Sequence, residues 1–219
     1  LLREAGNRFG ELDALTGLGR THEQLGDLAR ARACYEEVAD LARRFGLREN
    51  EADALNNLGA NEFLRGDPVA ALEHLRAALR IRESLGNVFN MVIPATNIAR
   101  ALSQLGRFND AEACLDSLLV ICQEQGYVDQ QASILEALAS LCMERGNHDE
   151  ALTLYRRVVG FGESAPIARR MQGHIGSARA LAAMDSVGAA VALLEGPARL
   201  LRPSLSADHV MVYEQELGE

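Results

Sequence analysis

The sequence repeats itself with a period of 40 residues. One series of glycines recurs at Gly26, Gly66, Gly106 and Gly146, and a second recurs at Gly6, Gly46, Gly86 and Gly126. Alanine recurs with the same step at Ala31, Ala71, Ala111 and Ala151. A period of about 20–50 residues is the signature of a repeat protein, in which each unit buries its apolar face against its neighbours. The chain is therefore expected to be a stack of similar units.

Each repeat has the pattern of two helices. In the second repeat the helices are expected at about residues 50–65 and 68–84. Gly66 suits a left-handed cap at the end of the first helix, Asp67 can cap the second, and Pro68 fits its first turn. Valine, isoleucine and threonine form no alternating runs, so no strand is predicted. The expected fold class is all-α, an α-solenoid of eleven or twelve antiparallel helices forming a right-handed superhelix.

Small residues occupy one position in the middle of each first helix. This column holds Gly19, Gly59, Ala99 and Ala139. Glycine inside a helix costs about 1 kcal/mol relative to alanine, so Gly59 needs a compensating gain. The alanine column of the second helix is equally small, and a large residue follows each alanine by four positions, at Tyr35, Leu75, Leu115 and Tyr155. The two columns predict a close helix–helix contact, at which leucine would overpack residue 59 and alanine would be tolerated.

These columns resemble the tetratricopeptide repeat family. The resemblance rests on "LG" at 18–19 and 58–59, "GD" at 26–27 and 66–67, the alanine column and the large residue after each alanine. The family repeat is usually about 34 residues, so a 40-residue repeat implies longer helices. Leucine or alanine replaces the family's usual tryptophan, at Leu15, Leu55, Ala95 and Leu135. This longer style is similar to that of bacterial signalling and transcriptional regulators. The resemblance implies a cytoplasmic protein-interaction scaffold.

The repeats are expected to form a single array over residues 1–219, without a separate second domain. Residues 1–6 are expected to end a preceding helix, and four repeats cover about 7–46, 47–86, 87–126 and 127–165. A degenerate repeat follows at 166–205, in which Ser186 and Val191 stand where glycine and alanine are expected. Residues 206–219 are expected to start another repeat. The segment "GFGESAP" at 160–166 predicts a longer loop, and the ragged ends predict that the array continues in a longer protein.

Several function classes find no support in the sequence. The net charge of −9 argues against nucleic-acid binding, and no run of about 18 apolar residues predicts a membrane span. Neither a phosphate-binding loop nor a catalytic or metal-binding motif is present, so no cofactor, metal or enzymatic activity is expected. The cysteines at 34, 114, 122 and 142 are expected to be reduced and to pack as small, buried apolar side chains. His74 and His148 are expected to pack rather than bind metal.

The remaining candidate is a surface along one side of the first helices, expected to line a concave groove. Its candidate peptide-binding residues are Arg20, Asn56, Asn57, Phe63, Thr96, Asn97, Arg100 and Glu136. Asparagine can both donate to and accept from a peptide backbone, and arginine can bind a carboxylate with two hydrogen bonds. Alternatively, the asparagines brace neighbouring helices. The chain has no lysines at the positions of the family's carboxylate clamp, which argues against that mode of binding.

Two functional hypotheses follow from this surface. In the first, the groove binds a protein or peptide partner, as the interaction region of a larger bacterial signalling or regulatory protein. In the second, the array is structural, and it dimerises or positions an attached output domain. The terminal segment carries an apolar face of Val210, Met211, Tyr213 and Leu217, through which two copies could pair.

Overall fold

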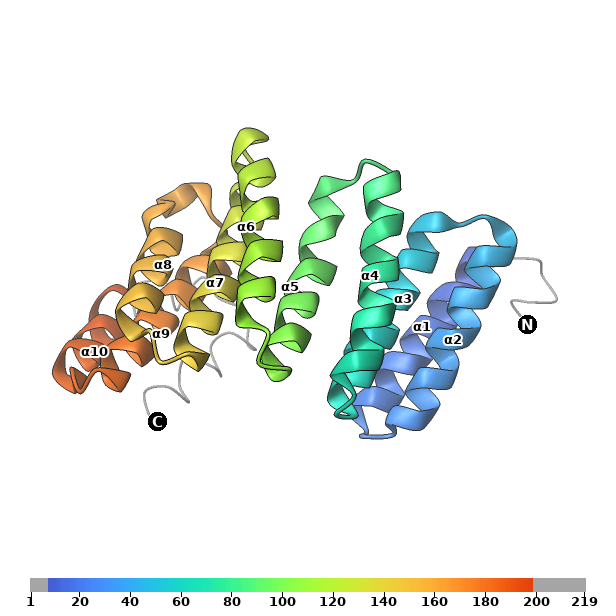
Figure 1. Ribbon diagram of the computed structural model, residues 1–219, viewed down its shortest axis with the longest axis horizontal. Helices are drawn as coiled ribbons and strands as arrows, with labels where there is room; N and C mark the ends of the chain where they lie inside the picture. Colours follow the sequence, from blue (N-terminus) through green and yellow to red (C-terminus); the bar gives the residue numbers. More distant parts are fainter. Residues whose placement is uncertain (1–7, 199–219) are drawn as a thin grey trace. The chain divides into compact units, whose positions relative to one another are not determined.

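The computed structural model describes residues 8–198, which contain ten α-helices and no strand. The helices are α1 Arg8–Gln24, α2 Leu28–Phe45, α3 Arg48–Leu64, α4 Pro68–Ser84, α5 Val88–Gln104, α6 Phe108–Glu124, α7 Val128–Glu144, α8 His148–Gly160, α9 Ile167–Ala183 and α10 Val187–Leu193 (Figure 1). The expected second-repeat helices at 50–65 and 68–84 thus correspond to α3 and α4. The all-α repeat fold is confirmed. Val210, Met211, Tyr213 and Leu217 lie outside the described residues.

The chain forms two compact parts, which we call the N-terminal half (residues 1–111) and the C-terminal half (residues 112–219). In the N-terminal half each helix from α1 to α5 packs on the next, and α3 also contacts α1 and α5. In the C-terminal half α7 packs on α8, α8 on α9 and α9 on α10, and α7 also contacts α9. Within each half, the first helices of successive repeats therefore form one layer.

The turns between helices follow the predicted cap chemistry. Glycines 26, 46, 66, 86, 106, 126 and 146 all have φ angles between 67° and 82°, in the left-handed region that glycine adopts without steric cost. Asp67 accepts a hydrogen bond from the Ala70 backbone N–H (2.9 Å), and Pro68 occupies the first turn of α4. The caps predicted at Gly66, Asp67 and Pro68 are confirmed.

The glycine in the middle of α3 marks a very close helix–helix contact. A Cβ atom on Gly59 would lie 2.4 Å from Cγ of Leu75 and 3.1 Å from the Ala71 carbonyl oxygen. Gly19 is equivalent, since its Cβ would lie 2.5 Å from Cε1 of Tyr35. The close contact is confirmed. The expectation that alanine is tolerated at Gly59 is wrong, however, because the fully buried Leu75 would have to move.

The fifth repeat is shifted by one residue from the predicted register. α8 ends at Gly160, a 3-10 turn covers Gly162–Ser164, and α9 begins at Ile167, so the predicted break at 160–166 is confirmed. The left-handed turn residue is Asp185 (φ 58°), not Ser186. The buried small residue of α10 is Ala190 (6% exposed), whereas Val191 is 42% exposed. The predicted places of Ser186 and Val191 are therefore wrong by one residue, since the spacing from Gly146 and Ala151 is 39.

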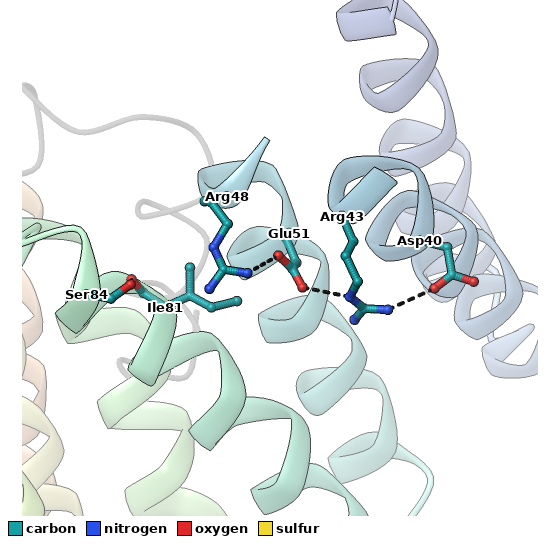
Figure 2. Close-up of polar contacts among 6 residues, drawn as sticks. All are labelled: Asp40, Arg43, Arg48, Glu51, Ile81 and Ser84. Carbon is teal, nitrogen blue, oxygen red and sulfur yellow. Dashed lines mark hydrogen bonds and ion pairs between the residues drawn. The ribbon is translucent and has the colours of Figure 1, made fainter. Parts of the chain in front are cut away.

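Buried charges connect consecutive helices. Glu51 is only 4% exposed, and its carboxylate accepts hydrogen bonds from Arg43 Nε (3.0 Å) and Arg48 Nη1 (2.6 Å) (Figure 2). Arg43 also contacts Asp40 (3.2 Å). A buried carboxylate is tolerated only when it is paired, so this cluster fixes α2 against the start of α3.

A second ion pair involves Arg82 of α4, which is 4% exposed, whereas its partner Asp53 is exposed. Its guanidinium donates to the Asp53 carboxylate of α3 and to the Asn90 carbonyl oxygen of α5. One side chain thus joins three helices of the N-terminal half.

The cysteines only partly match the prediction. All four are free thiols, and Cys122 and Cys142 are buried, but Cys34 and Cys114 are half-buried. No helix in the described part of the chain is long and apolar enough to cross a membrane.

Candidate functional site

The layer formed by α1, α3 and α5, which we call the A-helix face, contains a pocket of about 230 Å³. Three predicted site residues line it: Phe63, Asn97 and Arg100. The other lining residues are Glu23, Gly59, Ala60, Leu64 and Leu75. Gly59 and Ala60 carry little or no side chain, and Leu75 packs where a Gly59 side chain would lie. The small column that brings α3 close to α4 therefore also contributes a residue to the pocket lining.

Arg100 and Phe63 form one wall of the pocket together. The Arg100 guanidinium carbon lies 4.7 Å from the centre of the Phe63 ring, a cation–π distance. A cation–π contact leaves the guanidinium N–H groups able to donate hydrogen bonds to a further acceptor. Arg100 is exposed, and among residues 8–198 it forms no ion pair with a carboxylate. The side chain is thus held in place for an incoming acceptor.

Two of the predicted asparagines contact each other. The Asn97 side-chain N–H donates to Asn56 Oδ1 (3.1 Å), which joins α5 to α3. This bond supports the bracing alternative. It uses only one group of Asn97, whose amide has a second N–H and an acceptor oxygen, and Asn97 also lines the pocket. Asn97 therefore combines a bracing contact with a position suited to ligand binding.

Other predicted residues lie outside the pocket lining. Asn57 is half-buried. The Thr96 hydroxyl donates to the Ile93 carbonyl of its own helix (2.9 Å). Arg20 is exposed on α1, close enough that its charge acts on the Tyr35 phenol. These three residues extend the A-helix face but do not build the pocket.

Glu23 was not among the leading candidates. It accepts a hydrogen bond from the Tyr35 hydroxyl (3.1 Å), and burial together with the Glu23 charge raises the pKa of Tyr35. Glu23 thus places a carboxylate in the pocket lining that also contains Arg100. Its position in the first repeat, equivalent to Phe63 in the second, is the signal that could have identified it.

Glu136 belongs to the C-terminal half, on α7. Its carboxylate accepts a hydrogen bond from Arg169 of α9 (3.0 Å), and Arg169 also contacts Asp129 (3.0 Å). Burial raises the pKa of Glu136 to about 7, although the Arg169 charge acts in the opposite direction. Glu136 is therefore part of an ion-pair cluster that joins α7 to α9.

The His, Cys, Asp and Glu side chains of residues 8–198 form no candidate metal site, since no group of three or more of them could hold a metal ion. The pocket on the A-helix face offers an apolar floor, one cation, one anion and an amide, which are the elements of a recognition site.

Comparison with known proteins identifies the fold. The family model for the tetratricopeptide repeat matches residues 10–84 and 91–163. Comparison with curated protein sequences gives no match. Among solved structures, BtubC (BKLC) from P. vanneervenii is similar with a TM-score of 0.70 and 19% identity, over 88% of this chain and 80% of that one.

Two further similar structures contain peptides. The Rap conjugation gene regulator of plasmid pLS20, in complex with the Phr* peptide, has a TM-score of 0.72 and 16% identity, over 99% of this chain and 61% of that one. NprR in complex with its cognate peptide NprX has a TM-score of 0.64 and 14% identity, over 100% of this chain and 66% of that one. At these identities the similarity shows the fold. With the family model matching more than half of its length, the chain belongs to the tetratricopeptide repeat family.

Proposed function

We propose that the chain is a protein-interaction scaffold, and that the A-helix face of its N-terminal half binds an extended segment of a partner protein. The observation that carries the proposal is the pocket in which Phe63, Asn97 and Arg100 converge. Its volume of about 230 Å³ is below the roughly 300–1,000 Å³ of small-molecule sites. The pocket therefore suits one side chain of a longer ligand.

The lining indicates how such a segment would be held. An apolar side chain would enter between Phe63 and Leu75. Asn97, with its remaining donor and acceptor, would bind the segment's backbone. Arg100 would bind a carboxylate, either an acidic side chain or a C-terminus. Asn57, Thr96 and Arg20 would contact the segment on either side of the pocket.

The similar structures support this reading in general terms. Two of them, the Rap conjugation gene regulator and NprR, are solved in complex with peptides. By analogy, we propose that this chain is the peptide-binding part of a larger cytoplasmic signalling or regulatory protein of bacteria. This assignment rests on shared fold.

The test is a titration in which the partner segment is mapped first. The full chain captures its partner in a pull-down, overlapping peptides locate the bound segment, and fluorescence anisotropy measures its affinity. A hydrogen bond to a charged group contributes about 1.5–3 kcal/mol, so Arg100→Ala should weaken binding roughly tenfold to a hundredfold. Arg76→Ala, at an exposed position on α4, is the matched control and should leave the affinity unchanged.

The competing hypothesis is a structural array without a ligand of its own. It predicts that no segment binds, or that Arg100→Ala, Asn97→Ala and Phe63→Ala all leave the affinity of the mapped segment unchanged. Either result would move the interaction away from the A-helix face. Because Asn97 also braces α3, thermal melts must accompany the Asn97→Ala titration.

A further inference from the structure

A second hollow lies in the C-terminal half, where α8, α9 and α10 meet. It has a volume of about 430 Å³, within the range of small-molecule sites. We call it the α9 trough. Its apolar lining comes from Val159 of α8, Leu181 of α9, and Ala189, Ala192 and Leu193 of α10.

The trough lies beside an unusually short second helix. α10 has 7 residues, whereas α2 and α4 have 18 and 17. The α-helical pattern stops at Leu193 and continues as a wider π-helical turn over Leu194–Ala198. Pro197 explains this boundary, because it has no N–H to donate to the Leu193 carbonyl four residues earlier. α10 packs on α9, and polar residues of α9 line the trough beside it.

The polar part of the lining has one sign of charge. Arg156 of α8 and His174 and Ser177 of α9 line the trough. Arg170 lies one turn before His174, and its charge is the one that acts on the His174 ring. Within the described range, neither Arg156 nor Arg170 forms an ion pair, and Arg170 Nε is buried without a hydrogen-bond partner.

His174 connects the polar and apolar parts. It is 8% exposed and makes no hydrogen bond from its side chain to another described residue. Burial and then the Arg170 charge lower its pKa, so the ring is neutral at pH 7 and can donate one hydrogen bond. Ser177 already donates to the Gly173 carbonyl oxygen (2.7 Å).

We propose that the α9 trough binds a small amphipathic carboxylate, with its hydrocarbon part against α9 and α10 and its carboxylate toward Arg156 and His174. Charge complementarity decides between ligand classes, because an apolar hollow that is bordered by the Arg156 guanidinium and has no carboxylate in its described lining favours an anion over a cation or a neutral molecule. The planar guanidinium binds a carboxylate with two hydrogen bonds. The single-sided polar lining suits a ligand with one charged end.

Three probes with one carbon skeleton test the proposal on the full chain: 4-phenylbutyrate, 4-phenylbutanol and 4-phenylbutylammonium. Calorimetry measures affinity, and the NMR signals of the His174 ring, assigned with a His174→Gln variant, report binding at this site. We expect saturable binding of 4-phenylbutyrate that shifts the His174 signals, binding of the alcohol at least tenfold weaker, and no binding of the ammonium compound. Equal affinities for the three probes, or no shift of His174, would overturn the proposal.

Variants at exposed positions locate the contact without disturbing the core. Arg156→Gln should weaken 4-phenylbutyrate binding about tenfold, whereas the adjacent Arg157→Gln should have no effect. Ala192→Phe should fill the trough and abolish binding. Arg156, Arg157 and Ala192 are exposed, so the melting temperatures should stay within a few degrees of the parent. Equal effects of the two arginine variants on 4-phenylbutyrate affinity would contradict a specific contact with Arg156. NMR shifts of His174 that change with protein concentration in the absence of any probe would indicate that a second copy of the chain, and not a small carboxylate, binds the trough.

Discussion

At the scale of single residues, Gly59 links stability to the candidate site. Its missing side chain allows Leu75 to pack against the backbone of α3, and both residues also line the pocket that contains Phe63. A substitution at this position acts on both properties. A substitution at Gly59 therefore cannot distinguish an effect on stability from an effect on ligand binding, whereas a substitution at Arg100 tests ligand binding.

Gly59→Ala should destabilise the protein. Overpacking at a buried contact costs about 1–3 kcal/mol, and better helix propensity offsets about 1 kcal/mol of this. Gly17 of α1 is the matched control, because it is also inside a helix but nothing lies within 4 Å of an added Cβ. Chemical denaturation should show a loss of about 1 kcal/mol for Gly59→Ala and a gain of up to about 1 kcal/mol for Gly17→Ala. A gain for both would disprove the close contact.

Residue types and columns were predictable from the sequence, but pairings between repeats were not. The small column and the stripe containing Phe63, Asn97 and Arg100 follow from the period alone. The bond between Asn56 and Asn97 joins neighbouring columns 41 residues apart, and it depends on the angle between helices. Such angles are set by packing, which a 40-residue period does not specify.

At the scale of helices and turns, the repeat holds until the fifth unit. Cap residues predicted the boundaries of α3 and α4 to within two residues, because glycine and aspartate have strong local preferences at helix ends. The one-residue shift before α10 could not be read in the same way. The turn residue at this place is Asp185. Aspartate can adopt the left-handed backbone conformation at moderate cost, so the turn does not need a glycine that would mark it in the sequence.

The shifted register gives a paired prediction at this turn. Asp185 has a φ of 58° and Ser186 a φ of −92°. Asp185→Gly should relieve the left-handed strain and stabilise the C-terminal half by roughly 0.5–1 kcal/mol. Ser186→Gly should destabilise it or leave it unchanged, because its backbone needs no glycine and Ser186 precedes α10 as its cap residue. If thermal melts ranked the two variants in the opposite order, Ser186 and not Asp185 would be the left-handed turn residue, as the 40-residue period predicts.

At the scale of the whole molecule, some carboxylates of this acidic chain are buried and paired with arginines. Glu51 and Glu62 are 4% and 3% exposed and paired with arginines, and Glu136 is held by Arg169. At Glu136 burial outweighs pairing and raises the pKa to about 7. Stability of the molecule should therefore depend on pH in a range where ordinary carboxylates no longer titrate.

Glu136 makes the folded protein more stable at low pH than at high pH, because its pKa is raised on folding. Its ordinary pKa is 4.5 and its folded pKa about 7, so between these values the folded protein binds more protons than the unfolded chain. The contribution of Glu136 to stability is then highest below about pH 4.5 and is lost as the pH rises from there through 7. A shift of this size corresponds to about 3 kcal/mol. Glu136→Gln removes the ionisation and should reduce the stability difference between pH 5 and pH 8 by about 2–3 kcal/mol, as measured by urea denaturation. Glu163→Gln, at an exposed position, should leave that difference as in the parent. If both variants kept the parent's pH profile, burial would not control the titration of Glu136.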